Sequence, residues 1–126
     1  MLRPSDTAAL AEFGLSAETT VDGGFVTVRI DDFPVPLPLV PQSVSLLLRL
    51  PMGFPDATPD MFWVDPPVRG PTGGQVAGTE LIEVHAGRNW QRWSRHIQGH
   101  WRPGVDNLAT YLAYVRRCLA LAADAT

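Results

Sequence analysis

The chain has 126 residues, of which 45% are hydrophobic and 18% are charged, and its formal net charge is −3. These values are typical of one globular domain, expected to span residues 1–126, and they exclude wholesale disorder. The net negative charge argues against general binding to nucleic acid.

The ends and the hydropathy of the chain predict a cytoplasmic protein. No apolar run approaches the ~20 residues that a membrane-spanning helix needs. The first six residues, Met-Leu-Arg-Pro-Ser-Asp, lack the apolar segment of a secretory signal. The single cysteine, Cys118, excludes an internal disulfide and a CxxC metal site. All ten basic residues are arginine, so the chain offers no lysine side chain for isopeptide modification.

The first half of the chain predicts a helix followed by strands. Ser5 or Asp6 can cap a short helix that runs to about Phe13, and Gly14 is placed to end it. A glycine turn at 22–24 lies between two β-rich runs, which is typical of a hairpin. Four prolines between positions 34 and 41 predict an irregular loop. The predicted strands are residues 18–21, 25–30, 43–50 and 60–64.

The second half predicts a loop and one amphipathic helix. Residues 66–80 are rich in Gly and Pro, which indicates an exposed loop. Apolar residues then recur in steps of three and four, with Asp106 as the expected cap. The predicted apolar face comprises Val105, Leu108, Leu112, Val115, Leu119 and Ala122. The fold class predicted is α+β, with an N-terminal helix, a four-stranded antiparallel meander and a C-terminal helix.

The segment 84–105 differs in composition from the rest of the chain. It contains three histidines, three of the four tryptophans and four arginines but no carboxylate, so it carries a local charge of about +4. These residues are His85, His96, His100, Trp90, Trp93, Trp101, Arg88, Arg92, Arg95 and Arg102. We therefore place the candidate site in this segment.

A metal site and a catalytic site are two open interpretations of this segment. His96 and His100 have the i, i+4 spacing of zinc ligands, with His85 as a third, although Gly99 and Pro103 disfavour the helix that this spacing requires. Alternatively, Ser94 and His96 lie on the same side of a strand, so that His96 can act as nucleophile or base, and Arg92 or Arg95 can stabilise negative charge. Nothing close in sequence supplies the acid that would orient His96.

Three non-catalytic interpretations compete with these. Arginine interleaved with tryptophan suits phosphates and stacked bases, but the acidity of the whole chain opposes nucleic-acid binding. Tryptophans also fill cores, with arginines stacked over them. The same residue types anchor protein interfaces. The candidate binding residues are Trp90, Arg92, Trp93, Arg95, Trp101 and Arg102. Cys118 lies beside the apolar stripe of the last helix, which is typical of a packing residue, although Arg116 and Arg117 can lower its pKa.

Two stretches together carry a family resemblance. Residues 50–55, Leu-Pro-Met-Gly-Phe-Pro, and the following Pro-Asp-Met-Phe-Trp at 59–63 resemble the strand-to-loop signature of ubiquitin-conjugating enzymes. The Trp-Arg-Pro at 101–103 is similar to the Trp-x-Pro before the helix that follows their active site. Most closely, these motifs resemble a bacterial ubiquitin-conjugating-like family whose members occur beside ubiquitin-like proteins, activating-enzyme-like proteins and JAMM-type peptidases.

The departure from that family pattern decides the functional prediction. The stretch equivalent to the catalytic cysteine, near residues 91–96, contains no cysteine, and His85 stands in His-Ala-Gly where the enzymes have His-Pro-Asn. A thioester relay requires a thiolate. We therefore expect a component of a bacterial ubiquitin-like system that acts without a cysteine thioester and without a cofactor. It is a candidate pseudoenzyme. Its expected partners are those that the resemblance implies. Acyl transfer at Ser94 and His96, assisted by His85, and a metal-binding or structural adaptor remain as alternatives.

Overall fold

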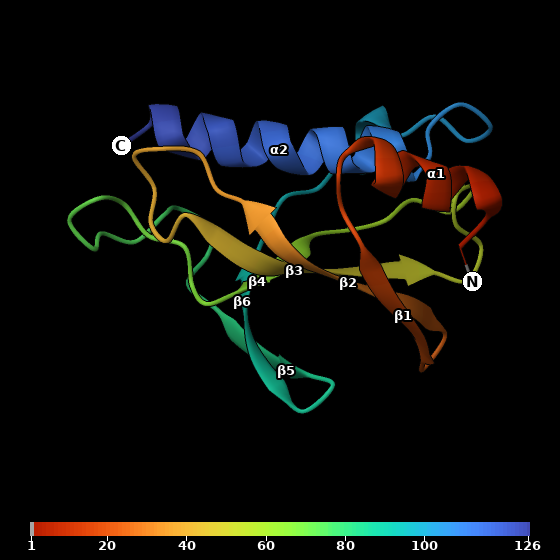
Figure 1. The fold of residues 1–126 in the computed structure, drawn as a ribbon, viewed down its shortest axis with the longest axis horizontal. Helices are drawn as coiled ribbons and strands as arrows, with labels where there is room; N and C mark the ends of the chain where they lie inside the picture. The colour runs from red at the N-terminus through yellow and green to blue at the C-terminus, as the bar shows by residue number, and fades with distance from the viewer. Residues whose placement is uncertain (1) are drawn as a thin grey trace.

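The structure is a computed structural model that describes residues 2–126 (Figure 1). It contains two α-helices, six strands and one short 3₁₀ helix. In chain order these are α1 (Pro4–Glu12), β1 (Ala17–Asp22), β2 (Phe25–Pro34), β3 (Ser43–Pro51), β4 (Phe62–Asp65), β5 (Ile82–His85), β6 (Arg88–Trp93), η1 (Gln98–His100) and α2 (Leu108–Asp124). The predicted α+β class is confirmed, with six strands in place of the four predicted.

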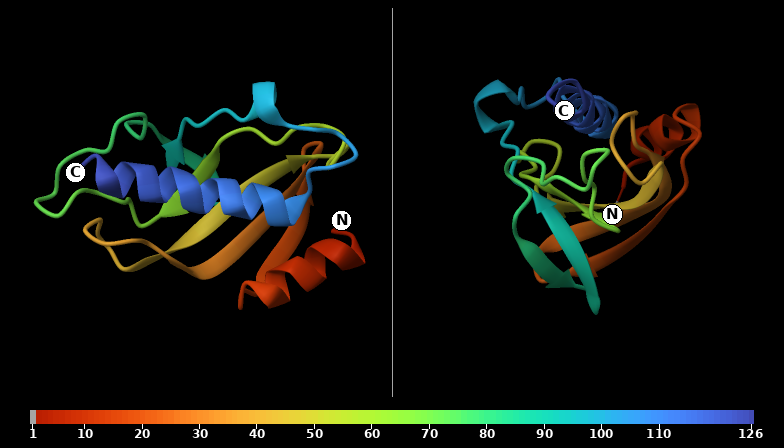
Figure 2. Two further views of the ribbon diagram at one scale, coloured as in Figure 1. Left: turned by 90° about the horizontal axis from the view of Figure 1, so that it is seen from above. Right: turned by 90° about the vertical axis from the view of Figure 1, so that its left-hand side faces the viewer.

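The six strands form one antiparallel sheet in the order β1-β2-β3-β4-β6-β5. Both helices lie on the same face of the sheet, and the β5–β6 hairpin projects away from them on the other side (Figures 1 and 2). Residues at alternate positions of a strand point to opposite faces, so the sheet has two separate apolar layers.

The layer beneath the helices is the main core. It joins β2, β3 and β4 to the apolar face of α2, whose buried residues Leu108, Leu112, Val115, Leu119 and Ala122 were predicted from their spacing. Val105 is 59% exposed, because the helix begins after it with Asn107 as the N-cap. The predicted cap, Asp106, instead bonds to the backbone N–H and the guanidinium of Arg102.

The predicted N-terminal elements agree with the structure within a few residues. Helix α1 begins with Pro4 at its first position, and Gly14, at φ +71°, follows its end. Asp6 accepts a hydrogen bond from the backbone N–H of Arg3, which satisfies a free donor at the start of the helix. Gly23 and Gly24 both have positive φ, as the tight turn between β1 and β2 requires.

The hairpin of β5 and β6 was not predicted. Its strands are joined by a turn in which Ala86 and Gly87 both have positive φ. The loop before it, predicted to be exposed, buries Val68, Val76 and Thr79, so it also contributes to the interior. Among the described residues, no helix is both long enough and apolar enough to span a membrane.

Candidate functional site

The candidate site begins where β6 ends. The strand finishes at Trp93, and the next residues continue as irregular backbone beside the segment that leads into β4. The backbone N–H of Met61 donates to the carbonyl of Arg95, with an N–O distance of 3.2 Å. This contact continues the β4–β6 pairing, in which Phe62 lies opposite Trp93. It therefore brings the residues after β6 next to those before β4.

The pairing places His96 against Asp60. Nδ1 of His96 lies 2.6 Å from Oδ1 of Asp60, although the two residues are 36 positions apart. Their side chains are 53% and 38% exposed, respectively, so the pair is open to solvent and to a partner. A carboxylate on Nδ1 fixes the orientation of the ring and favours the tautomer that leaves Nε2 with a free lone pair. The orienting acid that the neighbouring sequence lacks is therefore Asp60.

Ser94 does not join this pair. It follows the last residue of β6, and its backbone N–H donates to the carbonyl of Gly78. In the described part of the chain its hydroxyl has no hydrogen bond to His96. The two residues thus do not share a strand face as the sequence predicted, because the strand ends at Trp93.

Glu83 organises a second cluster on the sheet face away from the helices. Its carboxylate accepts hydrogen bonds from the indole N–H of Trp63, at 2.9 Å, and from the guanidinium of Arg92, also at 2.9 Å. Nε2 of His85 lies 3.2 Å from the same carboxylate, and the His85 ring meets Trp63 edge-on at 5.2 Å. Burial acts to raise the pKa of Glu83, but these hydrogen bonds and the charge of Arg92 outweigh it and lower the pKa below 4.5.

We predict that Glu83→Gln lowers the free energy of unfolding by about 1–3 kcal/mol at pH 7. The amide accepts fewer charge-assisted hydrogen bonds and leaves Arg92, whose Nε is already buried without a partner, without its carboxylate. Because the folded-state pKa of Glu83 is depressed, its contribution is complete above about pH 4.5 and is lost as the pH falls through the folded-state value. Urea unfolding between pH 3 and pH 8 measures both effects.

Glu80→Gln is the matched control, because Glu80 is exposed and, within residues 2–126, accepts only the backbone N–H of Gly78. We expect it to change stability by less than about 0.5 kcal/mol. Equal effects of the two substitutions, or an unchanged pH profile in Glu83→Gln, would contradict the role assigned to the Glu83 cluster.

The three tryptophans of segment 84–105 are buried. Trp90 packs with Leu47 and Trp63 beneath the hairpin, and Trp93 stacks on Phe62 in the main core at 5.4 Å. Trp101 is 8% exposed. These three side chains therefore pack in the interior, beneath the surface on which a partner would bind. The other predicted binding residues lie closer to solvent: Arg92 on Glu83, Arg95 over the Trp93 ring and Arg102 on Asp106.

Cys118 lies within α2 and is 6% exposed. Burial raises the pKa of its thiol, and the Tyr114 hydroxyl together with Arg95 and Arg117 offsets only part of this effect. A buried thiol that favours its protonated form is a poor nucleophile. Cys118 is thus placed as a packing residue.

The α+β fold and the position of the Trp-x-Pro before α2 agree with the resemblance found in the sequence. A family model described as prokaryotic E2 family E matches residues 2–122. The chain belongs to this family. Searches among curated proteins and among solved structures gave no significant match. Membership of prokaryotic E2 family E supports a role as a component of a ubiquitin-like modification system.

Within this E2-like fold, the stretch aligned by resemblance with the conjugating cysteine divides into two parts. Gln91 is buried, and its side-chain amide bonds to both the N–H and the carbonyl of Val68. Trp93 donates its indole N–H to the same Gln91 side chain. Residues 91–93 are therefore structural, and only the stretch from Ser94 to His96 is available for chemistry.

The histidines of this E2 family member do not come together. His85 contacts Glu83, His96 contacts Asp60, and His100 lines a pocket beside α2. No group of three or more His, Cys, Asp or Glu side chains that could hold a metal ion occurs within residues 2–126. The hypothesis of a zinc site at these three histidines gains no support from their geometry.

Proposed function

We propose that this chain is a component of a prokaryotic ubiquitin-like modification system that acts without a cysteine thioester. It binds a ubiquitin-like protein, or the activating or processing partner of one, through the surface of segment 85–102. The observation that carries the proposal is the position of Cys118, which is buried in α2 and lies 22 or more positions beyond the stretch 91–96. A thioester relay needs an accessible thiolate, and this thiol is neither accessible nor acidic.

The exposed charged groups of segment 85–102 are the parts of this surface that a partner can meet. The side chains of Arg88 and Arg102 are 39% and 67% exposed, and each is held by one carboxylate, Asp65 and Asp106 respectively. Fixed arginines lose less side-chain entropy when they bind a partner carboxylate. His96 lies on the same segment, so the proposed interface includes the His96–Asp60 pair.

The test combines binding with mass spectrometry. The chain is incubated with ubiquitin-like and activating-enzyme-like proteins of the same genome, and intact mass is measured with and without reductant and hydroxylamine. We expect stable binding and no adduct that reductant removes. An adduct that resists reductant but not hydroxylamine would indicate an ester or acyl-imidazole near residues 94–96. Absence of binding to any such protein would overturn the proposal.

Cys118→Ala tests directly whether Cys118 forms a thioester. We expect this variant to bind partners and to form any adduct as well as the parent chain, with a stability loss of about 1 kcal/mol or less from removing one buried sulfur. Pull-down and intact mass measure the first point, and thermal unfolding measures the second. A reductant-sensitive adduct that disappears in Cys118→Ala would establish a thioester at Cys118 and contradict the proposal.

A second candidate function is acyl transfer that uses His96 and Asp60. The observation that favours it is the 2.6 Å contact between the two side chains, which gives the ring an acid partner and leaves Nε2 directed elsewhere. Nε2 can then take the proton of an amine that attacks an activated acyl group carried by a partner; the new amide bond forms as the bond between the acyl carbon and its leaving group on that partner breaks. This hypothesis needs no cysteine and uses the only exposed part of the stretch 91–96.

A further inference from the structure

Within residues 2–126 the sheet has two free edges, which are formed by β1 and β5. Strand β1 is the longer of the two, with six residues against four, and every residue from Glu18 to Asp22 is exposed. It contains neither proline nor lysine, which commonly protect an edge strand from pairing with another chain. Strand β1 is therefore an open edge to which a further strand can be added.

The turn between β1 and β2 determines which backbone groups of β1 face this edge. The turn has two residues, Gly23 and Gly24, so the flanking Asp22 and Phe25 form a hydrogen-bonded pair. Along an antiparallel ladder such pairs alternate with pairs that are not hydrogen-bonded. The N–H and C=O groups of every second residue of β1 therefore point away from β2 and are available to an added strand. These residues are Ala17, Thr19 and Val21.

A pocket of about 520 Å³ lies between α1 and β1, on the face of the sheet that carries the helices (Figures 1 and 2). Its walls include Leu10, Ala11 and Leu15, and none of its lining residues is charged. Ala17 and Thr19 also line it, so the residues whose backbone faces the edge have their side chains on the pocket side. The alternate side chains of an added strand that lie on this face should be apolar.

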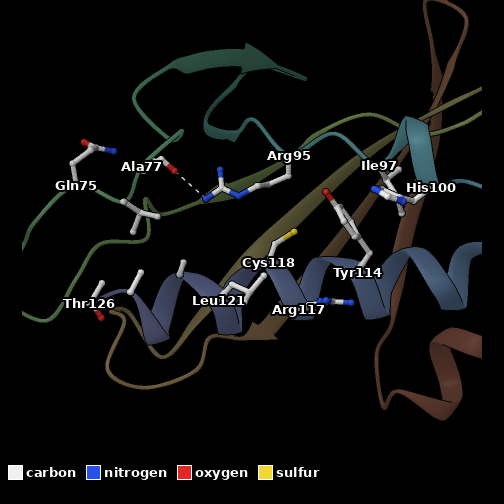
Figure 3. A pocket seen from close by; sticks show the side chains of 13 residues that line it. Gln75, Ala77, Arg95, Ile97, His100, Tyr114, Arg117, Cys118, Leu121 and Thr126 are labelled. Carbon is white, nitrogen blue, oxygen red and sulfur yellow. Dashed lines mark hydrogen bonds between the residues drawn. The ribbon is translucent and has the colours of Figure 1, made fainter.

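The pocket beside α2 has no such relation to the sheet, although its volume is larger, about 890 Å³. Polar side chains lie at both of its ends, with Gln75 and Thr126 at one end and Tyr114 and His100 at the other (Figure 3). None of its lining residues belongs to a strand, so it offers no backbone edge to a partner.

The other face of β1 is acidic. Glu18 and Asp22 lie on it, and Asp22 forms no ion pair within residues 2–126. Glu18 contacts Arg29 at 2.9 Å, but Arg29 also contacts Asp31, so three carboxylates share one arginine. Opposite charges on adjacent strands attract and like charges repel. An added strand should therefore be basic on this face, and a second copy of β1, which carries the same carboxylates, is a poorer occupant.

From these observations we infer that the free edge of β1 binds an extended segment of a protein partner as an additional antiparallel strand. The segment has apolar side chains on the face of the α1–β1 pocket and basic side chains on the face of Glu18 and Asp22. Strand β1 lies at the opposite end of the strand order from β5 and β6, so this surface is separate from segment 85–102. The inference does not depend on the proposed function.

The probe is the peptide acetyl-Lys-Val-Lys-Val-Lys-Val-Lys-amide, which as a strand has valine on one face and lysine on the other. Isothermal titration of the full chain should show that it binds, and that the peptide with glutamate in place of lysine binds at least about tenfold more weakly. In the antiparallel pairing the valine N–H groups donate to β1, so N-methylation of the valines should also weaken binding at least about tenfold. Amide hydrogen exchange at Thr19 and Val21 should become slower when the peptide is bound.

Thr19→Pro removes one of the N–H groups that face the edge and should weaken peptide binding at least about tenfold. Proline is tolerated where a strand N–H faces solvent, so the variant should stay folded, which thermal unfolding checks. Val84→Pro is the matched control on the other free edge, where the bond from Arg92 N–H to the Leu81 carbonyl sets the alternation and directs the Val84 N–H outward. It should leave binding unchanged. Asp22→Asn tests the acidic face independently and should weaken binding about threefold.

Three results would overturn the inference directly. These are no binding of the lysine peptide, equally tight binding of the glutamate or N-methylated peptide, and equal effects of Thr19→Pro and Val84→Pro. A free chain that sediments as a dimer, with the N–H groups of Thr19 and Val21 already protected from exchange, would also overturn it, because a second copy would then occupy the edge.

Discussion

Replacing Trp101 with alanine should lower the free energy of unfolding by about 3–5 kcal/mol. The indole is 8% exposed and packs against Phe54 at 5.9 Å and Tyr111 at 6.2 Å. Its N–H donates to the carbonyl of Pro55 at 2.9 Å. The substitution therefore removes a large apolar group from between the loop after β3 and the start of α2, and it leaves a partly buried carbonyl without its donor. Urea unfolding followed by far-UV circular dichroism measures the loss.

Trp101→Phe separates the two contributions. Phenylalanine keeps most of the ring contacts but has no donor for Pro55, so a loss of about 1–2 kcal/mol is expected. A loss below about 1 kcal/mol for Trp101→Ala would show that the side chain contributes little to the core. In that case the residue would be a candidate for direct partner contact, one of the interpretations that the composition of segment 84–105 leaves open.

The C-terminal helix was predictable because its signal is local. Its apolar residues repeat with the helical period and are buried against a sheet that covers one face. The error at its start has an equally local cause. Asp106 and Asn107 are both good capping residues, and the choice between them depends on Arg102, which binds Asp106 and leaves Asn107 to cap.

The β5–β6 hairpin was not predictable from the usual alternation of a half-buried strand. Ile82 and Val84 of β5 are exposed, whereas Glu83 and His85 lie on the other face of the strand, where they contact Trp63 and are partly covered. This inversion is tolerated because Trp63 and Arg92 supply hydrogen bonds to the Glu83 carboxylate. The partners come from other strands, so a pattern within five residues cannot reveal them.

The His96–Asp60 pair was missed for the same physical reason. Asp60 was noted only as part of the Pro-Asp-Met-Phe-Trp resemblance, and nothing local joins it to His96. The pair follows from the β4–β6 register, which sets Phe62 opposite Trp93 and Met61 against Arg95. Recognising β6 as a strand beside β4 is therefore the step that makes the acid predictable.

His96→Ala should reduce any acyl transfer that this chain supports by about 100-fold or more, whereas partner binding, to which Arg88 and Arg102 also contribute, should weaken by no more than about tenfold. The imidazole is exposed, and among the described residues its side-chain hydrogen-bond partner is Asp60, so its loss should not disturb the fold. Asp60→Asn should also reduce the rate strongly, because an amide that donates to Nδ1 favours the tautomer with the proton on Nε2 and so removes the base. The rate of product formation with purified partners measures transfer, and titration calorimetry measures binding.

His100→Ala is the matched control, since His100 is also exposed and follows on the same segment but lines the α2 pocket. A rate loss in His96→Ala and not in His100→Ala would assign the chemistry to the pair. Full transfer in His96→Ala would remove the catalytic candidate. If the parent chain binds its partner but supports no transfer, a non-catalytic adaptor is favoured. The surface around His96 would then serve recognition, and the partner would carry out the reaction.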